Sequence, residues 1–314
     1  MKRIVLFIGV LLSLTMLASA RGQKEPQKVG GKLQVVATIF PPYDFVREIA
    51  GDRVNLTMLL PPGAESHSFE PTPRDIITVQ NCDVFIYVGG ESDAWVEGIL
   101  KSMDTSRMSI ITLMDCVDVV EEEIVEGMEE EEEEGEEGPE YDEHVWTSPR
   151  NAKLIVQKIA EVLKQRDAPN APVYAQNTAA YLSKLDDLDR SFRELAGGAK
   201  RRTLIFGDRF PFRYFADAYD LRYFAAFPGC STETECSAAT IAFLVDKIRA
   251  ETIPVVFHIE LSNEKIADTL CEETGAQKRL LHAVHNITKR DFDTGKSYYS
   301  LMTQNLQNLK PALY

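Results

Sequence analysis

Residues 54–80, VNLTMLLPPGAESHSFEPTPRDIITVQ, show the repeating unit from which we expect the whole fold to be built. The apolar run Val54–Leu60 is typical of a buried strand, and Pro61-Pro62-Gly63 ends it in a turn. Thr72-Pro73 then supplies the cap and first position of a helix. The Pro-rich loop between strand and helix carries one histidine, His67, just beyond the strand end, where ligands of parallel sheets commonly bind.

The same alternation of strand and helix continues on both sides of this unit. Strand-like runs occupy Leu33–Phe40, Asp83–Gly90 and Met108–Met114, and helical spacing marks Tyr43–Gly51 and Asp93–Ser102. Alternating strands and helices predict a parallel sheet with helices on both faces.

The second half of the chain repeats this pattern after a purely helical region. Two amphipathic helices, Arg150–Arg166 and Val173–Leu195, have no strand between them and are followed by Gly197-Gly198. Strand-like runs then return at Thr203–Phe206, Leu221–Phe227, Pro254–Ile259 and Arg279–Val284. We therefore predict an α/β protein with two parallel-sheet lobes joined by a long spine helix, and a metal site in the cleft between the lobes.

The first twenty residues have the features of a secretory signal. Lys2-Arg3 precedes the apolar run Ile4–Leu17, and Ala18-Ser19-Ala20 resembles a cleavage site. We expect a cleavable signal peptide at 1–20 and a periplasmic or otherwise extracytoplasmic protein. The predicted domains are an N-terminal lobe (31–168), a linking helix (169–198) and a C-terminal lobe (199–314).

Most of the net charge of −15 comes from one segment, residues 121–140, which contains 13 glutamates and no basic residue. The remainder of the chain is near neutral, which argues against nucleic acid or anionic membranes as partners. We expect the segment to be a solvated acidic loop, and we hypothesise that it collects weakly bound cations near the cleft.

Histidines, rather than cysteines, have the distribution expected of a metal site. The five cysteines show no C-x-x-C spacing, and Cys230 with Cys236 could form a disulfide or remain small buried side chains. His67 and His144 come from loops of the first lobe, whereas His282 and His285 lie at the end of the last strand of the second. Three imidazoles that converge on one cleft would suit a tetrahedral zinc ion.

Four short segments carry a resemblance to a known family. Gly63–Asp75 resembles the "PG-x-x-x-H-x-[YF]-E-P-[ST]-P-x-D" segment of metal-specific solute-binding proteins that supply zinc and manganese ABC importers. Asp142–Pro149, DEHVWTSP, resembles that family's "D-P-H-x-W-L-D-P". Phe212–Ala216 and Tyr219–Leu221 resemble its "F-G-Y-F-A" and "Y-G-L".

The resemblance implies that His67 and His144 are the first and second metal ligands. The family's third histidine falls on Arg209, which cannot be deprotonated and does not ligate zinc. Asp208 beside it could supply a carboxylate instead. The last ligand of the family falls on His282, with His285 as the alternative.

We therefore expect a zinc receptor that delivers Zn²⁺ to an ABC permease in the inner membrane, acts as a monomer and is not an enzyme. A three-histidine site favours Zn²⁺ over Mn²⁺, although a manganese receptor or an adhesin-like member of the family remains an alternative. A zinc-dependent hydrolase fits less well because no H-E-x-x-H helix supplies a general base.

Overall fold

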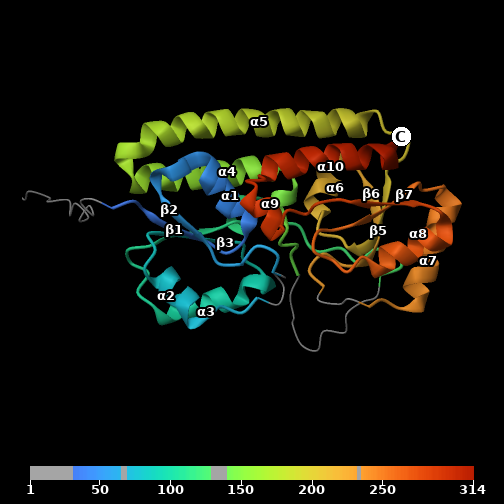
Figure 1. Cartoon of the computed structure of the whole chain (residues 1–314), viewed down its shortest axis with the longest axis horizontal. Helices are drawn as coiled ribbons and strands as arrows, with labels where there is room; N and C mark the ends of the chain where they lie inside the picture. The colour runs from blue at the N-terminus through green and yellow to red at the C-terminus, as the bar shows by residue number, and fades with distance from the viewer. Residues whose placement is uncertain (1–30, 65–68, 129–139, 232–234) are drawn as a thin grey trace, which may run out of the picture. The chain divides into compact units, whose positions relative to one another are not determined.

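Two four-stranded parallel sheets, one from each half of the chain, form the centre of the fold (Figure 1). The computed structural model describes residues 31–64, 69–128, 140–231 and 235–314. The predicted signal peptide and most of the acidic segment lie outside these residues. Within them, no helix combines the length and apolar character needed to cross a membrane.

The two sheets have the same strand order. The first contains β1 (Gln34–Ala37), β2 (Asn55–Met58), β3 (Val84–Tyr87) and β4 (Ser109–Thr112), arranged β2-β1-β3-β4. The second contains β5 (Thr203–Arg209), β6 (Arg222–Phe227), β7 (Val255–His258) and β8 (Gln277–Leu280), arranged β6-β5-β7-β8. All neighbouring strands are parallel. In each sheet the order reverses beside the first strand, the place where loops diverge and ligands commonly bind.

Helices cover both faces of each sheet because successive strand residues point to opposite sides. In β1, Val35 and Ala37 belong to the main core, whereas Val36 packs in a second cluster with Val79 and Val96. The helices are α1 (Phe40–Ala50), α2 (Pro73–Gln80), α3 (Ala94–Ser102), α4 (Pro149–Arg166), α5 (Ala171–Gly197), α6 (Arg213–Tyr219), α7 (Ala238–Glu251), α8 (Lys265–Thr274), α9 (Lys289–Asp293) and α10 (Tyr298–Leu313).

The longest helix, α5, runs along both lobes (Figure 1). It has 27 residues, roughly 40 Å of helix. It packs against α1 and α4 of the first lobe and against α6 and α10 of the second. Its buried side chains recur at helical spacing: Tyr174, Thr178, Tyr181, Leu185, Leu188 and Phe192. The predicted spine helix is confirmed.

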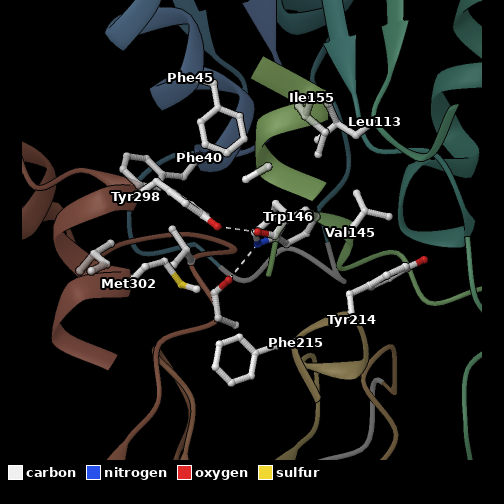
Figure 2. Packing of buried hydrophobic residues seen from close by; sticks show 14 of the residues in the cluster. Phe40, Phe45, Leu113, Val145, Trp146, Ile155, Tyr214, Phe215, Tyr298 and Met302 are labelled. Atoms are coloured by element: carbon white, nitrogen blue, oxygen red, sulfur yellow. Dashed lines mark hydrogen bonds between the residues drawn. The ribbon is translucent and has the colours of Figure 1, made fainter. Parts of the chain in front are cut away.

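The two lobes share one hydrophobic core, and Trp146 lies in it (Figure 2). The Trp146 side chain is fully buried, between Phe45 and Ile155 of the first lobe and Phe215 and Met302 of the second. Its indole N–H donates to the carbonyl of Ala283 at 2.8 Å, and the hydroxyl of Tyr298 donates to the carbonyl of Trp146 at 2.8 Å. The lobes are therefore joined by packing and by hydrogen bonds.

The structure decides between the two alternatives for Cys230 and Cys236, and it moves the end of the last strand. Cys230 and Cys236, both within the described residues, do not form a disulfide. The last strand ends at Leu280 rather than at Val284, because residues 281–284 leave the sheet and form a turn in which Val284 has a φ of 63°.

Candidate metal centre

His144 lies where the acidic segment rejoins the first lobe. A short antiparallel bridge joins Glu121 to Tyr141, and a 3-10 turn, Val145–Thr147, leads from His144 into α4. The imidazole is fully buried, and its Nδ1 lies 3.2 Å from Oδ1 of Asp142, which also accepts the backbone N–H of His144 at 2.7 Å. This arrangement favours the proton on Nδ1 and leaves the lone pair of Nε2 for a metal ion.

The surroundings of His144 are negatively charged. Burial opposes its protonation, but the carboxylates of Asp142 and Glu143 outweigh burial, so the pKa of His144 lies above its ordinary value. Tyr214 of the second lobe donates its hydroxyl to the carbonyl of Asp142 at 2.7 Å. Both lobes therefore fix this segment, in an environment that stabilises a cation.

His285 faces His144 from a turn of the second lobe. The two rings meet at 85° with their centroids 5.3 Å apart, and the His285 ring lies 5.0 Å from that of Trp146. Two imidazoles that bind one tetrahedral ion at about 2.1 Å place their centroids roughly 5 Å apart. A centroid distance of 5.3 Å is therefore compatible with two ligands of one zinc ion.

His282 occupies a different environment three residues earlier. Its Nδ1 lies 3.0 Å from the backbone nitrogen of Val284 and 3.3 Å from Oε2 of Glu260. Asn305 accepts the backbone N–H of His282 at 2.9 Å and donates to its carbonyl at 2.8 Å. These contacts place His282 within the packing of the turn, and it does not line the cavity beside His144.

A small cavity lies between the two facing imidazoles and the loops around them. His144, His285, Ala64, Arg209 and Glu260 contribute to its wall. Its volume of about 30 Å³ is enough for an ion with one or two water molecules. The cavity joins residues from both halves of the chain, as expected for a site between lobes.

His67 falls in residues 65–68, which lie outside the described part of the chain, but the segments on either side of it are described. Ala64 lines the cavity. The side-chain amide of Asn286 donates to the carbonyls of Pro61 and Ala64 at 2.9 and 2.8 Å. The residue next to His285 therefore holds the start of the loop that carries His67.

Asp208 and Arg209 are the last two residues of β5, and their side chains have different surroundings. The Asp208 carboxylate accepts the backbone N–H groups of Arg209 and Ile259 at 2.9 and 3.1 Å, and it lines a neighbouring cavity of about 190 Å³. Arg209 contributes to the walls of both cavities. The structure therefore places Arg209, and not Asp208, beside the two histidines.

Three residues important for this geometry were not identified as ligands from sequence. Glu260 holds the turn that carries His285, Asn286 reaches the 61–64 loop, and Trp146 binds the carbonyl of Ala283. Burial would raise the pKa of Glu260, but His282 and the neighbouring amides hold it below its ordinary value, so this carboxylate is ionised. From the sequence, Glu260 is expected to cap a helix or to support a ligand rather than to bind the metal itself, and its contacts with Ala283 and His285 fit the second of these roles.

The described ends of the acidic segment form a second group of possible ligands. Atoms of Glu122, Glu140 and Cys230 lie within 4.8 Å of one another. The backbone N–H of Glu122 donates to the carbonyl of Glu140 at 2.9 Å, which closes the base of the segment. This group lies beside the candidate centre, because Gly229, which precedes Cys230, lines the same cavity as His144.

Comparison with known proteins identifies relatives over nearly the whole chain. The model of the ZnuA family, zinc-uptake complex component A, periplasmic, matches residues 35–312. The high-affinity zinc uptake system protein ZnuA of Bacillus subtilis is 34% identical over 296 residues, or 94% of this chain and 92% of the relative. The zinc-binding lipoprotein AdcA of Streptococcus pneumoniae strain R6 is 32% identical over 310 residues, which are 99% of this chain but only 61% of AdcA.

Solved structures show the same architecture. The Zn(II)-bound ZnuA-like domain of S. pneumoniae AdcA superposes with a TM-score of 0.74 at 29% identity, over 90% of this chain and 99% of that domain. The metal-dependent lipoprotein YcdH of B. subtilis gives a TM-score of 0.76 at 32% identity, with the same coverage of 90% and 99%. Two parallel sheets and a long connecting helix are therefore common to this chain and these structures.

Proposed function

Because the chain belongs to the family of the periplasmic component A of zinc-uptake complexes, we propose that it captures Zn²⁺ in the cavity between its lobes and delivers it to an ABC permease in the inner membrane. The family consists of metal-binding receptors of uptake systems and not of enzymes. The zinc-dependent hydrolase considered above is therefore not supported. We propose further that residues 1–20 are a cleavable signal peptide and that the receptor acts as a monomer.

The proposed ligands are the imidazoles of His67, His144 and His285, with a water molecule in the fourth position. The observation that carries this assignment is the perpendicular arrangement of the His144 and His285 rings at 5.3 Å. His285 is favoured over His282 because it lines the cavity beside His144, whereas His282 does not. Asp208 is less suited because its carboxylate already binds two backbone amides beside the other cavity.

Three nitrogen ligands favour zinc over manganese, which prefers more carboxylate. The fixed positive charge of Arg209 on the wall adds no ligand and would oppose a hard cation held mainly by charge. Metal analysis of protein purified without added metal tests this preference directly. Zinc at about one equivalent, with manganese near background, is expected; the reverse ratio would contradict it.

Substitution of the two second-lobe histidines tests the ligand set. We expect His285→Ala to weaken zinc binding by more than about 100-fold, because it removes a ligand rather than a group that supports one. His282→Ala, three residues away, is the comparison variant and should cost less affinity than His285→Ala, because His282 contacts Val284 and Glu260 but does not line the cavity. Competition with a chromophoric chelator measures both. Intact binding in His285→Ala together with a large loss in His282→Ala would reverse the assignment.

A further inference from the structure

The end of β7 carries a buried carboxylate that reaches the turn containing His285. The side chain of Glu260 is only 6% exposed. Its Oε2 accepts the backbone N–H of Ala283 at 2.7 Å, and its Oε1 accepts that of His285 at 2.9 Å. One carboxylate therefore binds the amides on both sides of Val284.

The turn needs such a constraint because its backbone is strained. Val284 has a φ of 63°, a left-handed conformation that β-branched residues rarely adopt. Backbone of this kind persists when its surroundings impose it, and it is commonly found at functional sites. Without the left-handed residue, the side chains after β8 would continue to alternate as in a strand, and His285 would point in a different direction.

We propose that Glu260 is a positioning residue that holds the Ala283–His285 turn so that the His285 imidazole faces His144, and that it thereby sets the zinc affinity. This inference rests on the proposed zinc site. Both oxygens of Glu260 already accept amide N–H groups, which favours action through the turn over direct binding of the ion. Charge-assisted hydrogen bonds to backbone amides are among the stronger contacts available for this purpose.

A double-mutant cycle separates positioning from a direct or purely electrostatic effect. Glu260→Gln keeps the size of the side chain but replaces one amide acceptor with a donor. We expect it to weaken zinc binding by about 10- to 100-fold, as for groups that orient metal ligands. In the His285→Ala background the same change should alter affinity by less than about threefold, because the residue that Glu260 positions is already absent.

Two further variants separate the effect of the charge of Glu260 from the effect of its side-chain length. Glu260→Asp retains the charge but is one methylene shorter, so it should lose affinity like Glu260→Gln if the bonds to the turn matter. Glu264→Gln is the matched control, since Glu264 lies four residues later and pairs with Lys278 rather than with the turn. It should bind zinc like the parent protein. Thermal unfolding of each metal-free variant shows whether it folds. If Glu260→Gln does not fold, Glu260→Asp replaces it in the double-mutant cycle.

The possible outcomes lead to separate conclusions. If His285→Ala binds zinc normally, the proposed ligand set fails whatever Glu260 does. If His285→Ala weakens binding but Glu260→Gln causes an equal loss in both backgrounds, Glu260 acts as a ligand or by its charge, and the positioning role is overturned. Normal affinity in both Glu260→Asp and Glu260→Gln would also overturn it.

Discussion

At the scale of single residues, carboxylates orient both described histidines of the candidate centre. Asp142 contacts the ring and the backbone of His144, and Glu260 binds the backbone of His285. Contacts of this kind reduce the conformational entropy that the side chains lose when they bind an ion. The contact between Asp142 and the His144 ring also raises the basicity of that imidazole.

The contact between Asp142 and His144 leads to a pH-dependent prediction. Protons compete with zinc for His144, and the carboxylate holds the pKa of this imidazole above its ordinary value. Asp142→Asn should lower that pKa and weaken zinc binding by about 10- to 100-fold near neutral pH. The decline of affinity on acidification should also begin at a lower pH than in the parent protein.

Zinc affinities measured from about pH 5.5 to about pH 8 test both parts of this prediction. Asp104→Asn is a suitable control, because Asp104 is exposed and its carboxylate accepts the backbone N–H of Ser106. An Asp142→Asn variant with the affinity and pH profile of the parent protein would show that the carboxylate does not act on His144.

The sequence predicted the first-lobe ligand more readily than the second-lobe ligand. His144 stands in a continuous motif whose neighbours, Asp142 and Trp146, are also its contacts in the structure. The choice between His282 and His285 depends on where β8 ends and on the left-handed backbone of Val284. A valine gives no sequence signal for that conformation, because residues of its type normally avoid it.

At the scale of elements, helices and strands were predictable where the sequence carries clear capping residues, prolines or a regular apolar face. Thr72 and Asp75 form the reciprocal capping box at the start of α2, where the Thr-Pro pair predicted the cap. The helix predicted from Tyr43 begins earlier, at Phe40, because Pro41 and Pro42 are accommodated in its first turn. The spine helix was predictable because one apolar face persists over its whole length.

The acidic segment is an element whose removal should separate two kinds of zinc binding. Its base is closed by the Glu121–Tyr141 bridge and by the bond from Glu122 to Glu140. Replacing residues 127–139 with two glycines should therefore leave the histidine site intact. We expect weakly bound zinc equivalents to be lost while the tightest site changes by less than about threefold, since carboxylates bind zinc loosely.

Equilibrium dialysis with metal analysis, followed by uptake measurements in cells, tests this expectation. A variant of full length with every glutamate of 127–139 changed to glutamine separates the effect of charge from that of length. Unchanged stoichiometry and uptake in both variants would rule out a collecting role for the segment.

At the scale of the whole molecule, the two lobes share one core. They are joined by contacts between residues far apart in the chain, which no local sequence pattern predicts. Trp146 binds Ala283, and Arg47 donates to the carbonyl of Lys296 at 2.9 Å across 249 positions of the chain. The sequence could predict two lobes from their repeated pattern, but not which side chains would meet between them. With α5 packed on both lobes, we expect zinc binding to produce small tilts rather than a hinge closure.

Asp44 is a fully buried acidic residue at this junction. Its side chain is fully buried on α1, where it pairs with Arg47 and accepts the backbone N–H of Tyr298, the first residue of α10, at 2.6 Å. Burial raises its pKa to about 6, although Arg47 acts in the opposite direction. The folded protein therefore holds the proton of Asp44 more tightly than the unfolded chain does, and this has a measurable consequence for stability.

The stabilisation that Asp44 provides through its proton is fully present below about pH 4 and is lost as the pH rises through about 6. Asp44→Asn has no such titration, so its free energy of unfolding relative to the parent protein should increase by about 2–3 kcal/mol over this interval. Urea unfolding of both proteins, with metal removed, measures this difference, in which the titrations common to both cancel. Parallel pH curves would mean that the ion pair with Arg47 compensates the burial of Asp44 completely. If the free energy of unfolding of Asp44→Asn instead rises relative to that of the parent protein as the pH increases, then Arg47 does not fully compensate the buried charge of Asp44 at neutral pH.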